Sequence, residues 1–302
     1  MPPAIEARQL YKSYGDVTAV DGVDLTIEEG EVFALLGPNG AGKTTTVEIL
    51  EGHRPRTSGE VSVLGFDPQT GGRPFREQIG IVLQQQAVED VLTVREALQL
   101  YGSMFPKQRS VDELIDLVGL RPKAKRRIRT LSGGQKRRLE LALGMVGDPD
   151  VLFLDEPTTG FDPSARRQAW TVVEGLSSLG KTVLLTTHYM DEAQQLADRL
   201  AVISSGRIIA EGTPATLGGR ASAASVISFR VGASRPFDLP QDLAVDRSDD
   251  GPLTVTTTEP TRVLHRLTGW ALEGGFTLDH IEVRKPSLED VYLDLVGSQE
   301  GE

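Results

Sequence analysis

The segment GPNGAGKTT at residues 37–45 constrains the fold of this chain more than any other stretch. Its three glycines permit backbone angles that a side chain would forbid, so successive N–H groups can turn inward onto an anion. A strand-like apolar run (residues 32–36) precedes the segment, and a helix-compatible run (residues 43–50) follows it. This strand–loop–helix unit predicts an α/β domain with a phosphate-binding loop.

We call residues 37–45 the glycine loop. The loop residues predicted to contact a nucleotide are Gly37, Pro38, Asn39, Gly40, Ala41, Gly42, Lys43, Thr44 and Thr45. Lys43 can reach the outer phosphates, and the Thr44 hydroxyl can ligate the Mg²⁺ that accompanies them. The N-terminus of the following helix adds free N–H groups and a positive dipole end. The alternative is a chance glycine-rich turn, which average residue usage places in about one chain in a hundred of this size. The sequence therefore predicts a nucleoside triphosphate site.

Composition narrows the class of protein. The 302-residue chain carries a formal net charge of −11 and has no cysteine. A general affinity for nucleic acid or anionic lipid is disfavoured, because those partners need a basic surface. We find no apolar run of the ~18 residues that crossing a bilayer requires, and the N-terminus lacks the pattern of a signal peptide. We expect a cytoplasmic protein that reaches a membrane only through a partner.

Four short apolar runs each end at a group that can do chemistry. The runs, with the groups that follow them, are residues 32–36 (the glycine loop), 79–83 (Gln84), 151–154 (Asp155 and Glu156) and 183–187 (His188). Such runs, bounded by turn signals, are typical of buried strands in a parallel sheet. Ligands of these sheets bind beyond the carboxyl ends of the strands, so we expect all four groups at one edge.

This placement suggests a role for each group. Asp155 is expected to hold Mg²⁺, and Glu156 to polarise the attacking water as general base. Gln84 could ligate Mg²⁺ or orient that water, and His188 could hydrogen-bond the terminal phosphate. The alternatives are a strand-terminal turn for Asp155, a capped strand end for Gln84 and a structural histidine for His188. The glycine loop favours the catalytic interpretation.

A second glycine cluster, LSGGQ at residues 131–135, precedes another helix-compatible segment. Ser132, Gly133, Gly134 and Gln135 can form a second anion-binding nest at a helix start. One triphosphate does not need two such nests from one chain, so the second could meet the nucleotide held by a neighbouring copy. An ordinary capped turn is the alternative.

These motifs, in this order, resemble the ATPase subunit of an ATP-binding-cassette (ABC) transporter over residues about 5 to 215. The resemblance implies that ATP is the nucleotide and that Tyr14 stacks on its adenine. It further implies that LSGGQ closes over the ATP of the opposite subunit of a homodimer, and that Asp162 couples the two sites. Residues near Gln84 and the helical stretch to about 130 would face a separate transmembrane permease. Leu83 and Phe161 depart from the common pattern, which affects only loop shape.

The resemblance and the composition together predict a domain plan. A nucleotide-binding domain would occupy residues 1–218, with a mainly parallel core sheet, an N-terminal antiparallel β subdomain and a helical insert at about 87–140. Within the insert, Thr93 with Glu96 and Ser110 with Glu113 form capping-box patterns. A small α+β accessory domain would follow at residues 219–302, beginning in the small-residue linker GGRASAAS.

The ending PSLEDVYLDLVG resembles the drug-exporter and daunorubicin-resistance branch of the family. The sequence therefore predicts an ATP hydrolase that energises an exporter of drugs or lipid-like compounds, peripheral on the cytoplasmic face of the membrane. The alternatives are a non-transport ABC ATPase that acts on ribosomes or DNA, and the ATPase subunit of an importer. The basic stretch at residues 121–129 is interpreted as a solvated face, because it lacks interleaved aromatic residues.

Overall fold

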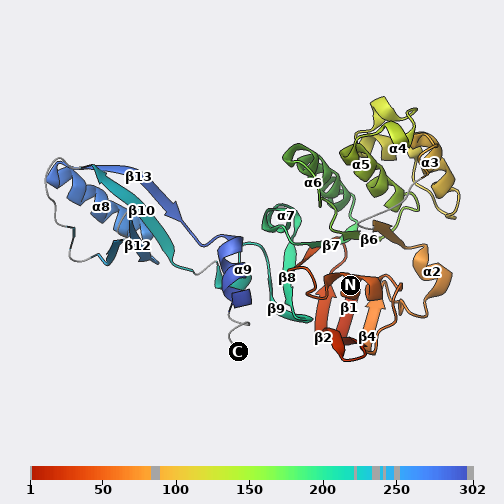
Figure 1. The fold of residues 1–302 in the computed structure, drawn as a ribbon, viewed down its shortest axis with the longest axis horizontal. Coiled ribbons are helices and arrows are strands. Elements are labelled where there is room, and N and C mark those ends of the chain that lie inside the picture. The colour runs from red at the N-terminus through yellow and green to blue at the C-terminus, as the bar shows by residue number, and fades with distance from the viewer. Residues whose placement is uncertain are drawn as a thin grey trace. The chain divides into compact units, whose positions relative to one another are not determined.

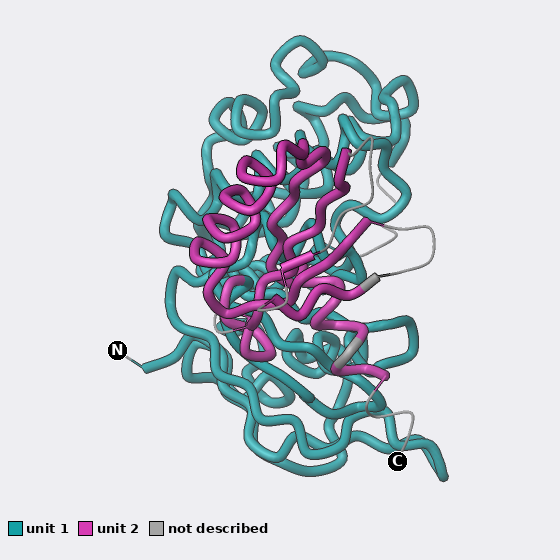
Figure 2. Tube along the Cα trace, turned by 90° about the vertical axis from the view of Figure 1, so that its left-hand side faces the viewer, with its two compact units in different colours: residues 1–214 teal, residues 215–302 magenta. Residues whose placement is uncertain are grey.

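The computed structural model (Figure 1) describes residues 2–82, 89–220, 223–232, 239–240, 243–247 and 252–297. Gln84 lies outside the described residues, so its predicted role is carried no further by the structure. The chain forms two compact units, Met1–Pro214 and Ala215–Glu302 (Figure 2). The division falls after Pro214, whereas the sequence places the domain boundary at residue 218.

A six-stranded sheet forms the centre of the first unit. Its strands, in spatial order, are β5 (Ile79–Val82), β6 (Val151–Asp155), β7 (Thr182–Thr187), β3 (Val32–Leu36), β8 (Arg199–Ser204) and β9 (Arg207–Gly212). The first five strands run parallel and β9 is antiparallel to β8. Every residue of β3 and β7 is buried. The four apolar runs are thus neighbouring parallel strands, as predicted.

A three-stranded antiparallel sheet packs against this core and confirms the predicted N-terminal β subdomain. Its order is β2 (Val17–Ile27), β1 (Ile5–Tyr14) and β4 (Ser58–Val63). Apolar side chains of both sheets meet in one buried cluster, which includes Leu10, Phe33 and Leu184. Burial of these groups against one another is the main force that holds the two sheets together.

Helices complete the first unit. Their bounds are α1 (Lys43–Leu50), α2 (Gly72–Arg76), α3 (Val94–Gly102), α4 (Val111–Leu117), α5 (Gly133–Gly144), α6 (Pro163–Ser178) and α7 (Met190–Leu196), with short 3₁₀ turns η1 (Arg121–Lys123) and η2 (Ile128–Thr130). Helices α3, α4 and α5 contact one another and gather beside the β5–β6 edge of the sheet (Figure 1). This group corresponds to the helical insert.

The two predicted capping boxes have different outcomes. Thr93 accepts from the Glu96 N–H, and Glu96 accepts from the Thr93 N–H, so the box at the start of α3 is complete. At α4, Ser110 accepts from the Glu113 N–H at 3.5 Å. The carboxylate of Glu113 instead lies 3.8 Å from Nε of Arg109, so the prediction of a reciprocal box there was wrong. A nearby guanidinium competes for the carboxylate that the box needs.

The second unit is a small α+β module. Its elements are η3 (Leu217–Gly219), β10 (Ser225–Gly232), β11 (Val245–Arg247), β12 (Leu253–Thr257), α8 (Pro260–Gly274), β13 (Thr277–Arg284) and α9 (Leu288–Gly297). The antiparallel sheet has the order β11-β12-β10-β13. Val263 and Leu267 of α8 pack on Ile227, Phe229 and Val255 of the sheet, which gives the unit a core of its own.

Candidate active site

The glycine loop joins β3 to α1 and is shaped around Lys43. The Lys43 side chain is only 5% exposed, and its Nζ donates to the carbonyl oxygens of Gly37 (2.8 Å) and Pro38 (3.1 Å). Gly42, the N-cap of α1, has a φ of 103°, and a Cβ there would lie 2.4 Å from the carbonyl oxygen of Ala19. Only glycine fits this position, because both the backbone angle and the close approach exclude a side chain.

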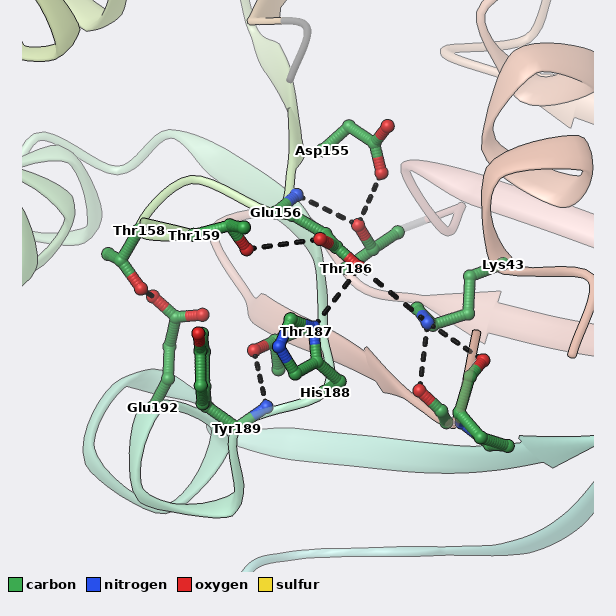
Figure 3. A network of polar contacts seen from close by, with 12 residues as sticks. Lys43, Asp155, Glu156, Thr158, Thr159, Thr186, Thr187, His188, Tyr189 and Glu192 are labelled. Carbon is green, nitrogen blue, oxygen red and sulfur yellow. Dashed lines mark hydrogen bonds and ion pairs between the residues drawn. The ribbon is translucent and has the colours of Figure 1, made fainter. Parts of the chain in front are cut away.

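A pocket of about 550 Å³ opens over this loop. Its lining residues are Ala19, Asn39, Gly40, Gly42, Lys43, Thr44, Thr45, Asp155, Glu156, Thr159 and His188. The carboxyl ends of β3, β6 and β7 therefore deliver the loop, two carboxylates and the imidazole to one cavity, as the strand pattern predicts. Figure 3 shows this convergence: Lys43, Glu156 and His188 come from three different segments and point toward one another.

Glu156 contacts three other side chains of the pocket. Its Oε1 lies 3.2 Å from Nδ1 of His188 and 3.8 Å from Nζ of Lys43, and its Oε2 accepts from the Thr159 hydroxyl at 3.0 Å. The backbone φ of Glu156 is 45°, a left-handed conformation that non-glycine residues rarely adopt. Such backbone conformations persist only where the surroundings hold them, and they cluster at functional sites.

Thr186, which the sequence analysis missed, joins the two carboxylate residues. Its hydroxyl donates to Oδ1 of Asp155 at 2.6 Å and accepts from the Glu156 N–H at 3.0 Å. Thr186 is fully buried on β7, the strand beside β6. The run of residues 183–187 carries no signal for this contact, because the pairing of β6 with β7 decides which hydroxyl faces Asp155.

The charge of Lys43 is balanced by the pocket. Burial lowers the pKa of Lys43, and the nearby carboxylates of Glu156 and Asp155 oppose that change. A buried ammonium is stabilised by pairing with an anion, and a triphosphate carries more negative charge than a carboxylate does. The arrangement suits the binding of a triphosphate.

The LSGGQ segment starts α5 at a second pocket of about 660 Å³. Ser132 is the N-cap of α5 and forms a complete capping box with Gln135. The pocket is lined by Ser132, Gly133, Gly134 and Gln135 and also by Glu156, Thr159 and Asp162, among others. Asp162 caps α6, where its Oδ1 accepts from the N–H groups of Ser164 and Ala165. Glu156 and Thr159 thus line both pockets.

Comparison with known proteins decides the family. The sequence matches the family described as ABC transporter over residues 20–159. Residues 225–287 match a second family, described as the ABC transporter domain-containing protein-like, C-terminal domain. The Nod factor export ATP-binding protein I of Sinorhizobium fredii is 40% identical over 304 residues, which is 98% of this chain and 87% of the relative. The chain belongs to the ABC transporter family of ATP-binding proteins.

Two further comparisons agree with this assignment. The daunorubicin/doxorubicin resistance ATP-binding protein DrrA of Streptomyces peucetius is 39% identical over 311 residues, covering 97% of this chain and 92% of the relative. The dimeric structure of a post-hydrolysis state of the ATP-binding cassette MJ0796 bound to ADP and Pi is 25% identical. It superimposes with a TM-score of 0.62 and covers 69% of this chain and 98% of that one. As a cassette of this family, the ABC protein binds and hydrolyses ATP.

A buried arginine of this ABC ATPase supports the loop after β6. Arg137 on α5 donates from Nε to the Pro157 carbonyl (3.0 Å) and from Nη2 to the Asp155 carbonyl (3.1 Å). It lies two residues beyond LSGGQ, so the helix that this segment starts also holds the backbone on either side of Glu156. Sequence reasoning missed Arg137, because an arginine in a polar helix has no signature of burial.

Four predicted nucleotide contacts line neither the glycine-loop pocket nor the pocket at LSGGQ: Tyr14, and Gly37, Pro38 and Ala41 of the glycine loop. The first of these, Tyr14, belongs to the N-terminal β subdomain. It ends β1, is 40% exposed, and lies under the cations of Lys12 and Arg54, at 4.8 and 5.4 Å from its ring centroid. Among the described residues that line the 550 Å³ pocket, Tyr14 is absent. Its stacking on adenine stays a prediction.

In the part of the chain that the structure describes, every helix is too short or too polar to cross a lipid bilayer.

Proposed function

We propose that this ABC ATPase energises an exporter of drugs or lipid-like compounds by hydrolysing ATP in a dimer attached to a separate transmembrane permease. The observation that carries the proposal is Glu156, whose carboxylate lies within reach of both His188 and Lys43 in the glycine-loop pocket. Export, rather than import, is supported by relatives named for Nod factor export and for daunorubicin resistance, each aligned over nearly the whole chain.

In this proposal each residue of the pocket has a separate role in hydrolysis. Lys43 and the loop N–H groups bind the outer phosphates, and Glu156 Oε1 accepts the proton of the attacking water. His188 orients that carboxylate through Nδ1, and its ring would hydrogen-bond the terminal phosphate. The Thr44 hydroxyl and the Asp155 carboxylate line the same pocket and are the oxygen ligands that Mg²⁺ prefers. When bound there, Mg²⁺ would neutralise the charge that develops on the phosphates.

A second subunit would complete each site. Ser132 and the first N–H groups of α5 lie at a pocket that shares Glu156 and Thr159 with the glycine-loop pocket. In a head-to-tail homodimer, this nest would bind the terminal phosphate of the ATP on the opposite subunit. The dimeric cassette MJ0796 supports the proposal that such an assembly suits this fold.

A pocket of about 380 Å³, lined by both apolar and charged side chains, would be the docking site of the permease. Its lining includes Tyr101, Met104, Phe105 and Leu143, from α3, the turn after it and α5. Met104 of this lining is 62% exposed. The pocket also includes Ile81 of β5, the strand that leads toward Gln84.

The proposal is tested by affinity capture of the tagged E156Q chain from native membranes with Mg·ATP, followed by identification of bound proteins. We expect a polytopic membrane protein in stoichiometric amount. Recovery of ribosomal proteins or chromosomal DNA instead would favour the non-transport alternative. Recovery of a permease together with a solute-binding protein would favour an importer.

A further inference from the structure

A second carboxyl group, at the start of α7, lies behind the Glu156–His188 pair. Glu192 is fully buried, at 0% exposure. Its Oε1 accepts from the Thr158 hydroxyl at 2.8 Å and from the Trp170 indole N–H at 3.2 Å. Thr158 stands two residues after Glu156, and Trp170 belongs to α6. One carboxyl oxygen therefore joins α7, the loop after β6 and α6 (Figure 3 shows the Thr158 contact).

Glu192 also lies near the residue that precedes His188. Burial raises the pKa of Glu192, and the hydroxyls of Thr187 and Thr158 are among the groups that oppose this rise. The Thr187 hydroxyl accepts from the Tyr189 N–H at 3.0 Å, so it fixes the backbone on both sides of His188. Glu192 is thus adjacent to both segments that carry the reacting pair.

The neighbours of Glu192 hold the imidazole itself. Asp191 accepts from Arg166 of α6 at 2.9 Å, and the Arg166 guanidinium lies 4.2 Å from the ring centroid of Tyr189. The Tyr189 ring lies 4.1 Å from the His188 ring. The start of α7 is therefore fastened to α6 by two separate sets of contacts, one at Glu192 and one through the stack that ends at His188.

Burial of the Glu192 carboxyl group, which joins three segments, carries a desolvation penalty. An apolar side chain of similar size would pack at this point with no desolvation penalty. Oε2 of Glu192 makes no hydrogen bond of normal geometry among the described residues, so burial of this group is only partly compensated. What the carboxyl supplies, and a hydrocarbon cannot, is a directional acceptor for the Thr158 hydroxyl.

We propose that Glu192 is a positioning residue for ATP hydrolysis: it holds the segment of Glu156 through Thr158, and it does so from the helix that begins two residues after His188, so that both segments keep their reactive geometry. It need not touch the substrate. The inference rests on the proposed role of Glu156 as general base, because geometry of the pair matters only if the pair handles the water. Small displacements of such a group can lower the rate by up to about 100-fold.

The test compares steady-state ATPase activity of the full chain and its variants. We expect E192A to lower kcat by about 10-fold or more while KM for ATP changes by less than about threefold, since the glycine loop is untouched. E192Q keeps an acceptor at Oε1 and should restore kcat to within about threefold of the parent chain. T158V removes the donor from the other side and should lower kcat in the same direction, which keeps the proposal testable if E192A does not fold.

A matched control is available on the same pair of helices. Gln195 of α7 donates to Glu174 of α6 at 3.0 Å on the exposed side, away from Thr158. Q195A should leave kcat unchanged. If Q195A lowers kcat as much as E192A does, or if E192A has no effect, the proposal is overturned. Equal losses of kcat and of ATP affinity in E192A would also overturn it, because they indicate a general loss of structure.

The E156Q background separates this proposal from the assignment of the base. If Glu192 acts through Glu156, adding E192A to E156Q should change the residual rate by less than about twofold. A further loss equal to that in the parent chain would show that Glu192 acts independently and would refute the proposal. If E156Q alone keeps full turnover, the role of Glu156 fails, whatever E192A does.

Discussion

Lys43 Nζ lies 3.8 Å from Oε1 of Glu156, and the same oxygen lies 3.2 Å from Nδ1 of His188. One oxygen of the proposed base therefore contacts both the phosphate-binding cation and the imidazole. A terminal phosphate would compete with Glu156 for Lys43, so nucleotide binding and release of the carboxylate are linked.

Glu156→Gln should slow ATP turnover by ~10²–10⁴-fold, the usual range for loss of a positioned base. Gln keeps the shape and the contact with Thr159 but cannot take a proton. ATP should still bind, which equilibrium binding of a fluorescent nucleotide measures. The exposed Glu174→Gln on α6 is the control and should hydrolyse ATP normally. Normal turnover by E156Q would remove the assignment of the base.

Lys43→Ala should weaken ATP binding itself, because it removes the buried cation that faces the outer phosphates. We expect a loss of about tenfold or more in affinity, since a hydrogen bond to a charged group contributes about 1.5–3 kcal/mol. Titration calorimetry with Mg·ATP measures the change. Lys107→Ala, a lysine outside the pocket, provides the comparison. Unchanged affinity of K43A would argue against the phosphate role of the loop.

Gly42→Ala and Gly40→Ala separate backbone strain from steric exclusion. Both positions have a positive φ, which costs a non-glycine residue roughly 1–2 kcal/mol. At Gly42 the new Cβ would also lie 2.4 Å from the Ala19 carbonyl oxygen, whereas at Gly40 nothing lies within 4 Å. G42A should therefore lose ATP binding, while G40A should lose thermal stability only mildly. Equal behaviour of the two variants would contradict the loop geometry.

Glu51, at the end of α1, should make stability depend on pH. It is 3% exposed, and burial, with the repulsion of Asp155 and Glu48, raises its pKa from 4.5 to about 8. The folded state then holds a proton that the unfolded state releases. The stability contributed by Glu51 is therefore complete below pH 4.5 and declines as the pH rises toward about 8.

Glu51→Gln should remove this decline, because an amide stays neutral throughout. Urea unfolding of both chains between these pH values measures the free energy of unfolding, and the difference between them isolates Glu51 from all other titrating groups. We expect E51Q to gain stability over the parent chain by on the order of a few kcal/mol as the pH rises. A difference that is constant with pH would show that Glu51 keeps an ordinary pKa.

The order of motifs along the chain was sufficient to predict the class of fold and most of the site. Apolar runs of four or five residues bounded by turn signals are typical of buried strands in a parallel sheet, and the carboxyl ends of such strands meet at one edge. From that rule the sequence predicts that the glycine loop, Asp155, Glu156 and His188 lie together. The sequence also predicts the role of glycines such as Gly42, since only glycine tolerates both the positive φ and the close approach of another backbone segment.

What the tertiary structure decided is which buried polar groups serve the reacting ones. Thr186, Arg137 and Glu192 have no local pattern that marks them, because each acquires its role from a partner that lies 18 to 34 residues away in sequence. The pairing of β6 with β7 places Thr186 on Asp155, and the packing of α7 against α6 places Glu192 on Thr158. The order of residues along the chain determines which reacting groups lie at the sheet edge. Long-range packing determines which buried side chains fix the positions of those groups.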